Sequence, residues 1–251
     1  MSQYSKQFFA SRQRAAREAA GEVVPLVRDL VRPRSVIDVG CAMGEWLSVF
    51  REHGVEDVYG IDGDYVQRDA LLIPQDRFKS CDLTKAIEID RRFDLALSLE
   101  VAEHLPESSA AEFVHSLARL APLVLFSAAI PFQGGTGHLN EQWQDHWAGH
   151  FETHGYVMID ALRGRIWSNA RVPWWYKQNM LIYADPEHLE EHDDLVQLRR
   201  ARELRVGGPV NLVHPDAYLK KADSRGKKLI RRLKARFAWT RRPAGRLGTN
   251  R

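Results

Sequence analysis

Cysteine is scarce in this chain, and long hydrophobic runs are missing from it. Cys41 and Cys81 are the two cysteines among 251 residues, and they form neither a disulfide framework nor the spacing of a zinc knuckle. We therefore expect a reduced, intracellular protein. No apolar run reaches the length of a membrane span, and the polar first residues contain no signal-peptide core. The sequence thus predicts a cytoplasmic chain.

The charges are divided unevenly along the chain. Thirteen of its 36 lysines and arginines, but one of its 33 acidic residues, lie from residue 220 onward. The body is therefore acidic and the tail strongly basic. Residues 227–242 combine apolar side chains with many cations, a pattern that favours an anionic membrane surface or protein partner and peripheral membrane binding. A solvated tail is the alternative. The charge of the tail is compatible with nucleic-acid binding, but the tail contains no recognised reading module, and we do not favour a nucleic-acid partner.

The hydrophobic pattern predicts a doubly wound α/β sheet of about seven strands. Residues 1–34 would form covering helices, residues 35–185 the main domain, residues 186–219 a charged surface helix and anchor, and residues 220–251 a basic helical or disordered tail. Within the main domain, the strand-like runs are residues 35–40, 58–61, 93–99, 123–128, 156–160 and 180–184, with a further short one before Asp82.

The run at residues 93–99 is followed by two acids and a histidine. If a helix begins near Glu100, Glu103 and His104 lie three and four residues on and share one helical face. The carboxyl ends of strands in open α/β sheets are where ligands bind. Two carboxylates and an imidazole suit Mg²⁺ or Mn²⁺. A helix N-terminus that favours acids, followed by an exposed histidine, is the alternative.

A second candidate site is the glycine turn at residues 40–44, between the first strand and a helix expected from Glu45. Glycines let the backbone approach a ligand closely, and the helix N-terminus presents unpaired N–H groups to it. Asp62 ends the next strand, about twenty residues later, where a carboxylate accepts hydrogen bonds from ribose hydroxyls. A third acid, Asp82, follows the short strand.

The loop at residues 130–143 is rich in glycine and carries His138. Because adjacent strands would place this loop near His104, His138 is a further candidate metal ligand, with a purely structural histidine as the alternative. Glu141 and Gln142, expected on the next helix, would hold a polar substrate. His146 and His150 have ligand spacing too, but no carboxylate cluster accompanies them, and we interpret them as helix packing.

Trp174, Tyr176 and Asn179 lie between the last two strands. Aromatic faces beside amide groups suit a sugar ring, whose C–H face is apolar and whose rim is polar. Ordinary packing of the last hairpin is an equal alternative.

These motifs resemble the class I S-adenosylmethionine-dependent methyltransferases. The resemblance is carried by residues 36–44, 60–62, 81–83 and 93–95, in the family's order and spacing, and covers about residues 35–184. It implies a Rossmann-like sheet that binds S-adenosylmethionine. Ala42 stands where the family commonly has glycine, so the loop must be right-handed helical or extended there, or slightly displaced. The implied cofactor-binding residues are Asp38, Gly40, Cys41 and Gly44 (Asp38 and the glycines around the methionine part), Asp62 (ribose), Asp82 (adenine amino group), Leu83 and Leu99.

The pattern Glu-x-x-Glu-His with one later loop histidine resembles the metal site of the small-RNA terminal 2′-O-methyltransferases, and Glu-Val-x-Glu-His also occurs in ubiquinone-pathway O-methyltransferases. The resemblance implies that Mg²⁺ or Mn²⁺ is held by Glu100, Glu103, His104 and His138, the last three being catalytic. Residues 134–147 and 174–183 look like those of bacterial methyltransferases associated with sugars and polysaccharides.

We therefore expect O-methylation of a sugar or polysaccharide precursor. A catechol or quinone precursor and the 2′-hydroxyl of an RNA 3′ end are alternative acceptors. A nicotinamide dehydrogenase is disfavoured, because Asp38 directly before the glycines is atypical of dinucleotide binders. An S-adenosylmethionine-binding regulatory protein without catalysis is the remaining class.

Overall fold

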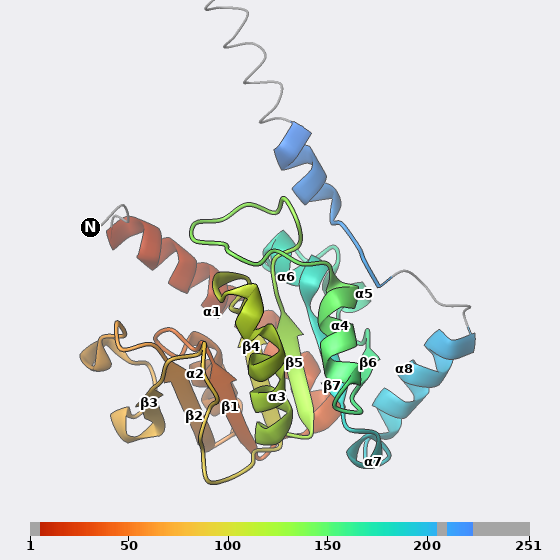
Figure 1. Ribbon diagram of the computed structural model, residues 1–251, viewed down its shortest axis with the longest axis horizontal. Helices are drawn as coiled ribbons and strands as arrows, with labels where there is room; N and C mark the ends of the chain where they lie inside the picture. The colour runs from red at the N-terminus through yellow and green to blue at the C-terminus, as the bar shows by residue number, and fades with distance from the viewer. Residues whose placement is uncertain (1–5, 205–209, 223–251) are drawn as a thin grey trace, which may run out of the picture. The chain divides into compact units, whose positions relative to one another are not determined.

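The computed structural model describes residues 6–204 and 210–222 (Figure 1). Two compact units are distinguished, Met1–Leu212 and Val213–Arg251. The expected amphipathic segment at residues 227–242 lies outside the described residues. Among the described residues, no helix combines the length and the apolar character needed to cross a membrane.

The first unit is built on one seven-stranded sheet with the order β3-β2-β1-β4-β5-β7-β6. β7 pairs antiparallel with both β5 and β6, and the other neighbours are parallel. This confirms the Rossmann-like α/β class. The strands are β1 (Ser35–Val39), β2 (Asp57–Asp62), β3 (Phe78–Ser80), β4 (Leu95–Leu99), β5 (Leu123–Ser127), β6 (Val157–Ile159) and β7 (Leu181–Ala184).

Helices cover both faces of the sheet, because alternate residues of each central strand point to opposite sides. Val36 and Leu95 pack with buried residues of α1 and α2, whereas Ile37 and Ala96 pack with those of α3 and α4. In Figure 1, α3 and α4 lie in front of the sheet and α1 passes behind it. The α-helices are α1 (Lys6–Val31), α2 (Glu45–Glu52), α3 (Ala110–Leu120), α4 (Gln144–Glu152), α5 (Arg163–Ile166), α6 (Trp174–Asn179), α7 (Pro186–Leu189) and α8 (Asp193–Leu204).

The N-terminal helical cover is the helix α1. The charged segment was expected as one surface helix, and that prediction was wrong. The charged segment is two helices, α7 and α8, because Leu189 and Leu195 are both fully buried. Residues six positions apart lie on different faces of one straight helix. The break between α7 and α8 lets both leucines reach the core.

Candidate metal centre and glycine turn

The turn after β1 is made by three residues with left-handed backbone. Gly40 has a φ of 88°, Ala42 of 49° and Gly44 of 86°. A Cβ on Gly40 would lie 2.3 Å from the Val101 side chain, so this approach requires glycine. Ala42 corrects our expectation of a right-handed or extended residue. Its N–H donates to Asp62 Oδ2 at 2.7 Å, which holds the alanine in a conformation that is costly for a residue with a Cβ.

Three carboxylates are buried around this turn. Asp38 and Asp62 are each 3% exposed, and Glu45 is 4% exposed. Burial raises the pKa of Asp38 well above its usual value, and the charges of Asp62 and Glu45 raise it further. Burial also raises the pKa of Glu45. Buried like charges cost free energy unless a cation pairs with them. The turn therefore favours a positively charged ligand.

Asp62 already has three donors. Its carboxylate accepts from the N–H of Ala42 and of Gly63, at 2.7 Å in each case, and from the hydroxyl of Tyr65. A Cβ on Gly63 would lie 2.3 Å from the Tyr65 ring, so glycine makes room for this contact. Tyr65 was not predicted, because no pattern in the sequence marks it.

The other predicted cofactor residues also lie at or just after the carboxyl ends of strands. Leu83 and Leu99 are each 8% exposed, and the thiol of Cys41 is buried. Burial, followed by the charge of Asp38, raises the pKa of Cys41 well above its usual value, so this side chain is a neutral thiol. Asp82 accepts from the N–H and the hydroxyl of Thr84, at 3.0 and 2.7 Å. The order β3-β2-β1-β4 thus brings all the predicted cofactor residues to one edge of the sheet.

The chain after β4 differs from the prediction. No α-helix begins at Glu100, which has a φ of 58°. Two short 3-10 helices, η3 (Ala102–His104) and η4 (Glu107–Ser109), follow, and α3 begins only at Ala110. The reason is a tertiary contact, because the Glu100 N–H donates to the carbonyl of Ser127 at 2.9 Å. Pairing with the neighbouring strand β5 therefore continues one residue past β4, and the backbone then turns sharply.

Glu103, His104 and His138 converge beside this turn. One possible ligand atom from each lies within 4.8 Å of the others. Glu103 is 1% exposed, and its Oε2 has no hydrogen-bond partner among the described residues. The rings of His104 and His138 meet edge to face, with centroids 4.8 Å apart. A buried carboxylate oxygen without a donor, next to two imidazoles, fits a divalent cation.

The surroundings of Glu103 and His104 shift the pKa of each side chain. Burial, and then the charge of Glu100, raise the pKa of Glu103 well above its usual value. Burial, and then His138, lower the pKa of His104. The Nδ1 of His104 lies 3.2 Å from the carbonyl oxygen of Gly137. Since a carbonyl only accepts, Nδ1 carries the proton and Nε2 keeps its lone pair for a ligand or a proton.

Glu100, the fourth predicted ligand, is not part of this three-residue group. Its Oε2 accepts from the Gln133 amide at 2.8 Å, and its Oε1 accepts from the Asn179 amide at 3.1 Å. Burial raises the pKa of Glu100, and these two amides oppose the rise. Gln178 completes this amide cluster by donating to Gln133 at 3.1 Å. Gln133 and Gln178 were not predicted, because an isolated glutamine has no sequence pattern that reveals its partner.

The predicted substrate residues have partners within the protein. Glu141 and Gln142 precede α4, so their placement on that helix was wrong. The Gln142 amide donates to Asn140 at 2.9 Å. Tyr176 is 7% exposed, and Trp46 meets its ring edge to face. Trp174 is half-buried and packs against Trp175 in the same manner. Substrate contact by these residues and by Asn179 stays a prediction.

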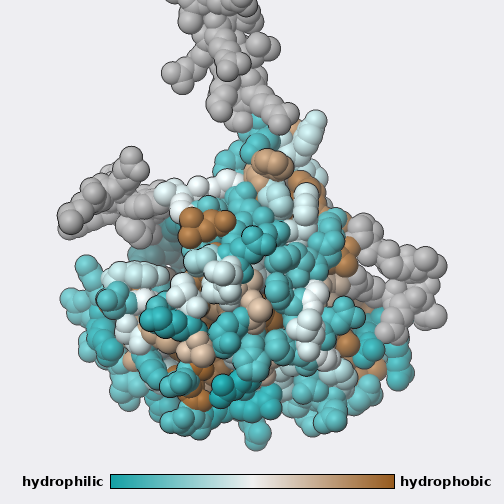
Figure 2. Space-filling model, viewed as in Figure 1, coloured by the Kyte–Doolittle hydropathy of each residue, from teal (hydrophilic) through white to brown (hydrophobic). Residues whose placement is uncertain are grey.

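The loop that carries His138 also exposes apolar side chains. Phe132 and Leu139, in the loop between β5 and α4, are 78% and 68% exposed. Figure 2 shows a mostly hydrophilic face with small, separate hydrophobic spots.

His146 and His150 lie on α4 with ring centroids 4.8 Å apart, and they are not among the candidate ligands found in the described part of the chain.

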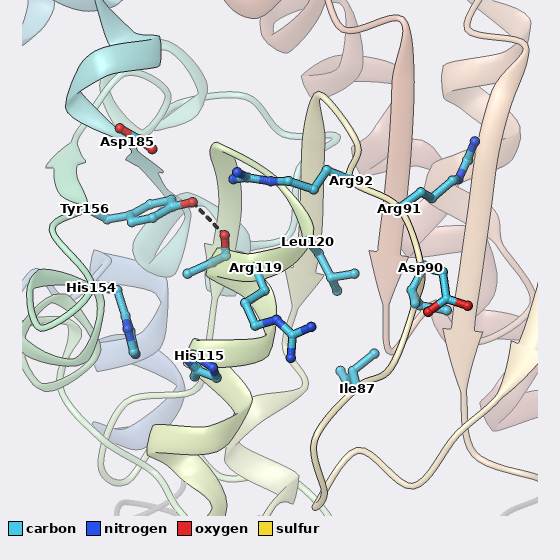
Figure 3. A pocket seen from close by; sticks show the side chains of 12 residues that line it. Ile87, Asp90, Arg91, Arg92, His115, Arg119, Leu120, His154, Tyr156 and Asp185 are labelled. Atoms are coloured by element: carbon cyan, nitrogen blue, oxygen red, sulfur yellow. Dashed lines mark hydrogen bonds between the residues drawn. The ribbon is translucent and has the colours of Figure 1, made fainter.

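A separate cavity of ≈ 630 Å³ opens near the amino ends of β4 and β5. The hydroxyl of Tyr156 donates to the carbonyl of Ala118 at 2.8 Å, and a dashed line marks this hydrogen bond in Figure 3. Burial raises the pKa of Tyr156 to about 12. No predicted site residue lines this cavity. Its lining is Ile87, Ile89, Asp90, Arg91, Arg92, His115, Ala118, Arg119, Leu120, His154, Tyr156 and Asp185.

Comparisons with known proteins agree with this architecture. The sequence model of the family described as "Methyltransferase domain" matches residues 10–169. No curated protein sequence matches the chain.

Three solved structures are similar. Magnesium protoporphyrin IX methyltransferase (ChlM) from Synechocystis PCC 6803, with bound SAM, is 18% identical over 73% of this chain and 86% of its own, with a TM-score of 0.52. DesVI from Streptomyces venezuelae is 13% identical over 71% and 95%, with a TM-score of 0.51. The methyltransferase domain of bacterial CtHen1 is 21% identical over 66% and 96%, with a TM-score of 0.47. The first two establish the shared fold.

Proposed function

This chain belongs to the methyltransferase domain family, and from that premise we propose that it is an S-adenosylmethionine-dependent O-methyltransferase. Its acceptor is a hydroxyl of a sugar or polysaccharide precursor, and a divalent cation, Mg²⁺ or Mn²⁺, assists the reaction. The observation that carries the proposal is the group of Glu103, His104 and His138, whose ligand atoms lie within 4.8 Å of one another.

The glycine turn supports S-adenosylmethionine as the methyl donor. This molecule carries a sulfonium and an ammonium group, and the buried carboxylates of Asp38, Glu45 and Asp62 surround the turn. A cation bound there would relieve their mutual repulsion. Asp62 would hold the ribose after giving up one of its present donors, because its Oδ1 already accepts from two groups.

The metal group supports transfer to oxygen. Glu103 would supply its unpartnered Oε2, and His104 and His138 would each supply Nε2. When bound, the cation acts as a Lewis acid that lowers the pKa of a coordinated hydroxyl. His104 is neutral at neutral pH because its pKa is lowered. Where the cation is absent or offset, its Nε2 would instead accept the proton that leaves the attacking hydroxyl.

Two neighbouring hydroxyls suit such a site best, because both can approach one cation. Sugars, catechols and ribose 3′ ends offer this arrangement. We rank sugars first, on the aromatic and amide side chains of α6. RNA ranks lower, because the body of the chain is acidic and repels phosphates. A partner for the basic tail, either an anionic membrane or a protein, is part of the same proposal.

Methyl transfer from labelled S-adenosylmethionine to a panel of glycans tests this proposal. We expect mannose- and rhamnose-type acceptors to be methylated, EDTA to abolish turnover, and Mn²⁺ or Mg²⁺ to restore it. E103A should lose more than about a hundredfold in turnover, since loss of a ligand costs more than loss of a residue that supports one, while cofactor binding is kept. E107A, at an exposed glutamate in the next turn, serves as the matched control.

The alternatives give different results. Turnover unchanged by EDTA would discard the cation and leave acid–base catalysis by the two histidines. Cofactor binding without transfer to any acceptor would indicate a regulatory protein.

A further inference from the structure

Glu141 lies in the loop between β5 and α4, where its carboxylate gathers three donors. Oε1 accepts from the N–H of Gly134 at 2.9 Å and lies 2.9 Å from Nδ1 of His138. Oε2 accepts from the N–H of Phe132 at 2.7 Å. The side chains of His138 and Glu141 are 9% and 21% exposed. Glu141 is therefore turned toward its own loop and toward a candidate metal ligand.

The contact with His138 fixes one tautomer. An ionised carboxylate only accepts hydrogen bonds, so Nδ1 of His138 must carry the proton. Its Nε2 then keeps the lone pair that a metal ligand needs. Without Glu141, the neutral ring would divide its proton between the two nitrogens, and the protonated Nε2 could not bind a cation.

The position of the ring is fixed from a second side. A Cβ on Gly135 would lie 2.0 Å from Nε2 of His138 and 2.3 Å from its Cε1. The imidazole therefore rests against glycine backbone, with Glu141 on its Nδ1 and the ring of His104 meeting it edge to face. This close fit leaves His138 little freedom to rotate away from the group.

We propose that Glu141 is a positioning residue of the metal group, which acts by holding His138 in the tautomer and orientation that make Nε2 a ligand. The inference rests on the proposed function, because it concerns the cation that Glu103, His104 and His138 would bind. It also gives Glu141 a role other than the substrate contact that the sequence suggested. Carboxylate partners of this kind support metal-binding histidines in general.

A titration of the full chain with Mn²⁺ tests the proposal without measuring turnover. Binding is measured as the loss of the EPR signal of free Mn²⁺. We expect E141A to weaken Mn²⁺ binding by about tenfold to a hundredfold. E141Q keeps an amide carbonyl that can accept from Nδ1, so we expect a smaller loss, and it serves where E141A does not fold. E107A should bind as the wild type does.

A double-mutant cycle with H138A separates positioning from a general effect on the loop. If Glu141 acts through His138, E141A should weaken binding in the wild-type background and cause no further loss in H138A. Additive losses in the cycle would show that Glu141 acts through the loop backbone, and they would overturn the proposal.

Nitrogen-15 NMR of the metal-free protein gives a second measurement that does not depend on the cation. We expect His138 to carry its proton on Nδ1 in the wild type and to show a mixture of tautomers in E141A. The same tautomer in the wild type and in E141A would overturn the inference, whether or not Mn²⁺ binds. If the wild type binds no Mn²⁺, or if E103A binds it normally, the proposed metal site fails, and the positioning role fails with it even where the tautomer of His138 depends on Glu141.

Discussion

At the carboxyl end of β1, the Asp38 carboxylate is 3% exposed, and the charges that act on it come from Asp62 and Glu45. All three effects, burial and the two neighbours, disfavour its ionised form. Asp38 is therefore well suited to bind a cationic ligand. In the ligand-free protein at neutral pH, the same surroundings lower the free energy of unfolding.

The effect of pH on stability follows from the direction in which this pKa changes on folding. The pKa of Asp38 is raised in the folded protein above the unfolded value of about 3.9. At a pH below the unfolded pKa, Asp38 is protonated in both states and does not reduce the free energy of unfolding. As the pH rises from there toward the folded pKa, the free energy of unfolding falls by about 1.4 kcal/mol per pH unit. We expect ligand-free D38N to be more stable than the wild type at pH 8, with the difference shrinking toward pH 4.

Urea unfolding between pH 4 and pH 8 measures this difference. D64N is the matched control, because Asp64 is an exposed acid in the loop that follows β2, and it should show no such trend. A D38N protein that is less stable than the wild type at pH 8 would contradict the assignment.

Candidate residues could be named from the sequence, but their partners could not. The sequence identified four candidates because acids and histidines near the carboxyl ends of predicted strands lie where ligands bind. These are Asp38, Glu103, His104 and His138. The contact between Glu141 and His138, in contrast, depends on how a glycine-rich loop folds back on itself. Tyr65 was missed for the same reason, since its contact with Asp62 exists only because residue 63 has no Cβ.

At the scale of elements, the buried strands were predicted nearly to the residue. β1, β4 and β5 are short, mainly apolar runs between turn residues, and such runs are typical of parallel strands that are buried on both faces. The segment after β4 was predicted wrongly because helix preference is local, whereas Ser127 of the neighbouring strand holds the N–H of Glu100. A tertiary hydrogen bond thus overrode a local tendency.

The first helix gives a prediction at this scale. Val23, Val27 and Leu30 of α1 are buried in the core that includes α2 and the back of the sheet. We expect L30A to lower the free energy of unfolding by about 2–5 kcal/mol, because the removed methyl groups leave a cavity. L26A is the matched control, since Leu26 is only half-buried and should cost less. Equal losses by denaturant titration would mean that α1 does not pack as described.

At the scale of the whole molecule, the two edges of the sheet differ in charge. The carboxyl edge holds the buried acids and the candidate metal ligands, and the opposite edge holds the cavity, where three arginines outnumber two aspartates. Because the acids lie at the proposed cofactor site, a ligand there should be chosen by its charge as well as its shape. Cationic S-adenosylmethionine is then favoured over dinucleotides, whose phosphates are negative.

Thermal unfolding with each ligand tests this selection. A ligand that binds only the folded chain at a hundred times its Kd adds about 2.7 kcal/mol, which raises the Tm of a chain of this size by roughly 5–11 °C. We expect this rise with S-adenosylmethionine, a smaller one with S-adenosylhomocysteine, which lacks the sulfonium charge, and none with NADH. D38N should lose most of the difference between the first two. A rise with NADH alone would favour hydride transfer, because repulsion by the buried acids would then not have excluded a dinucleotide.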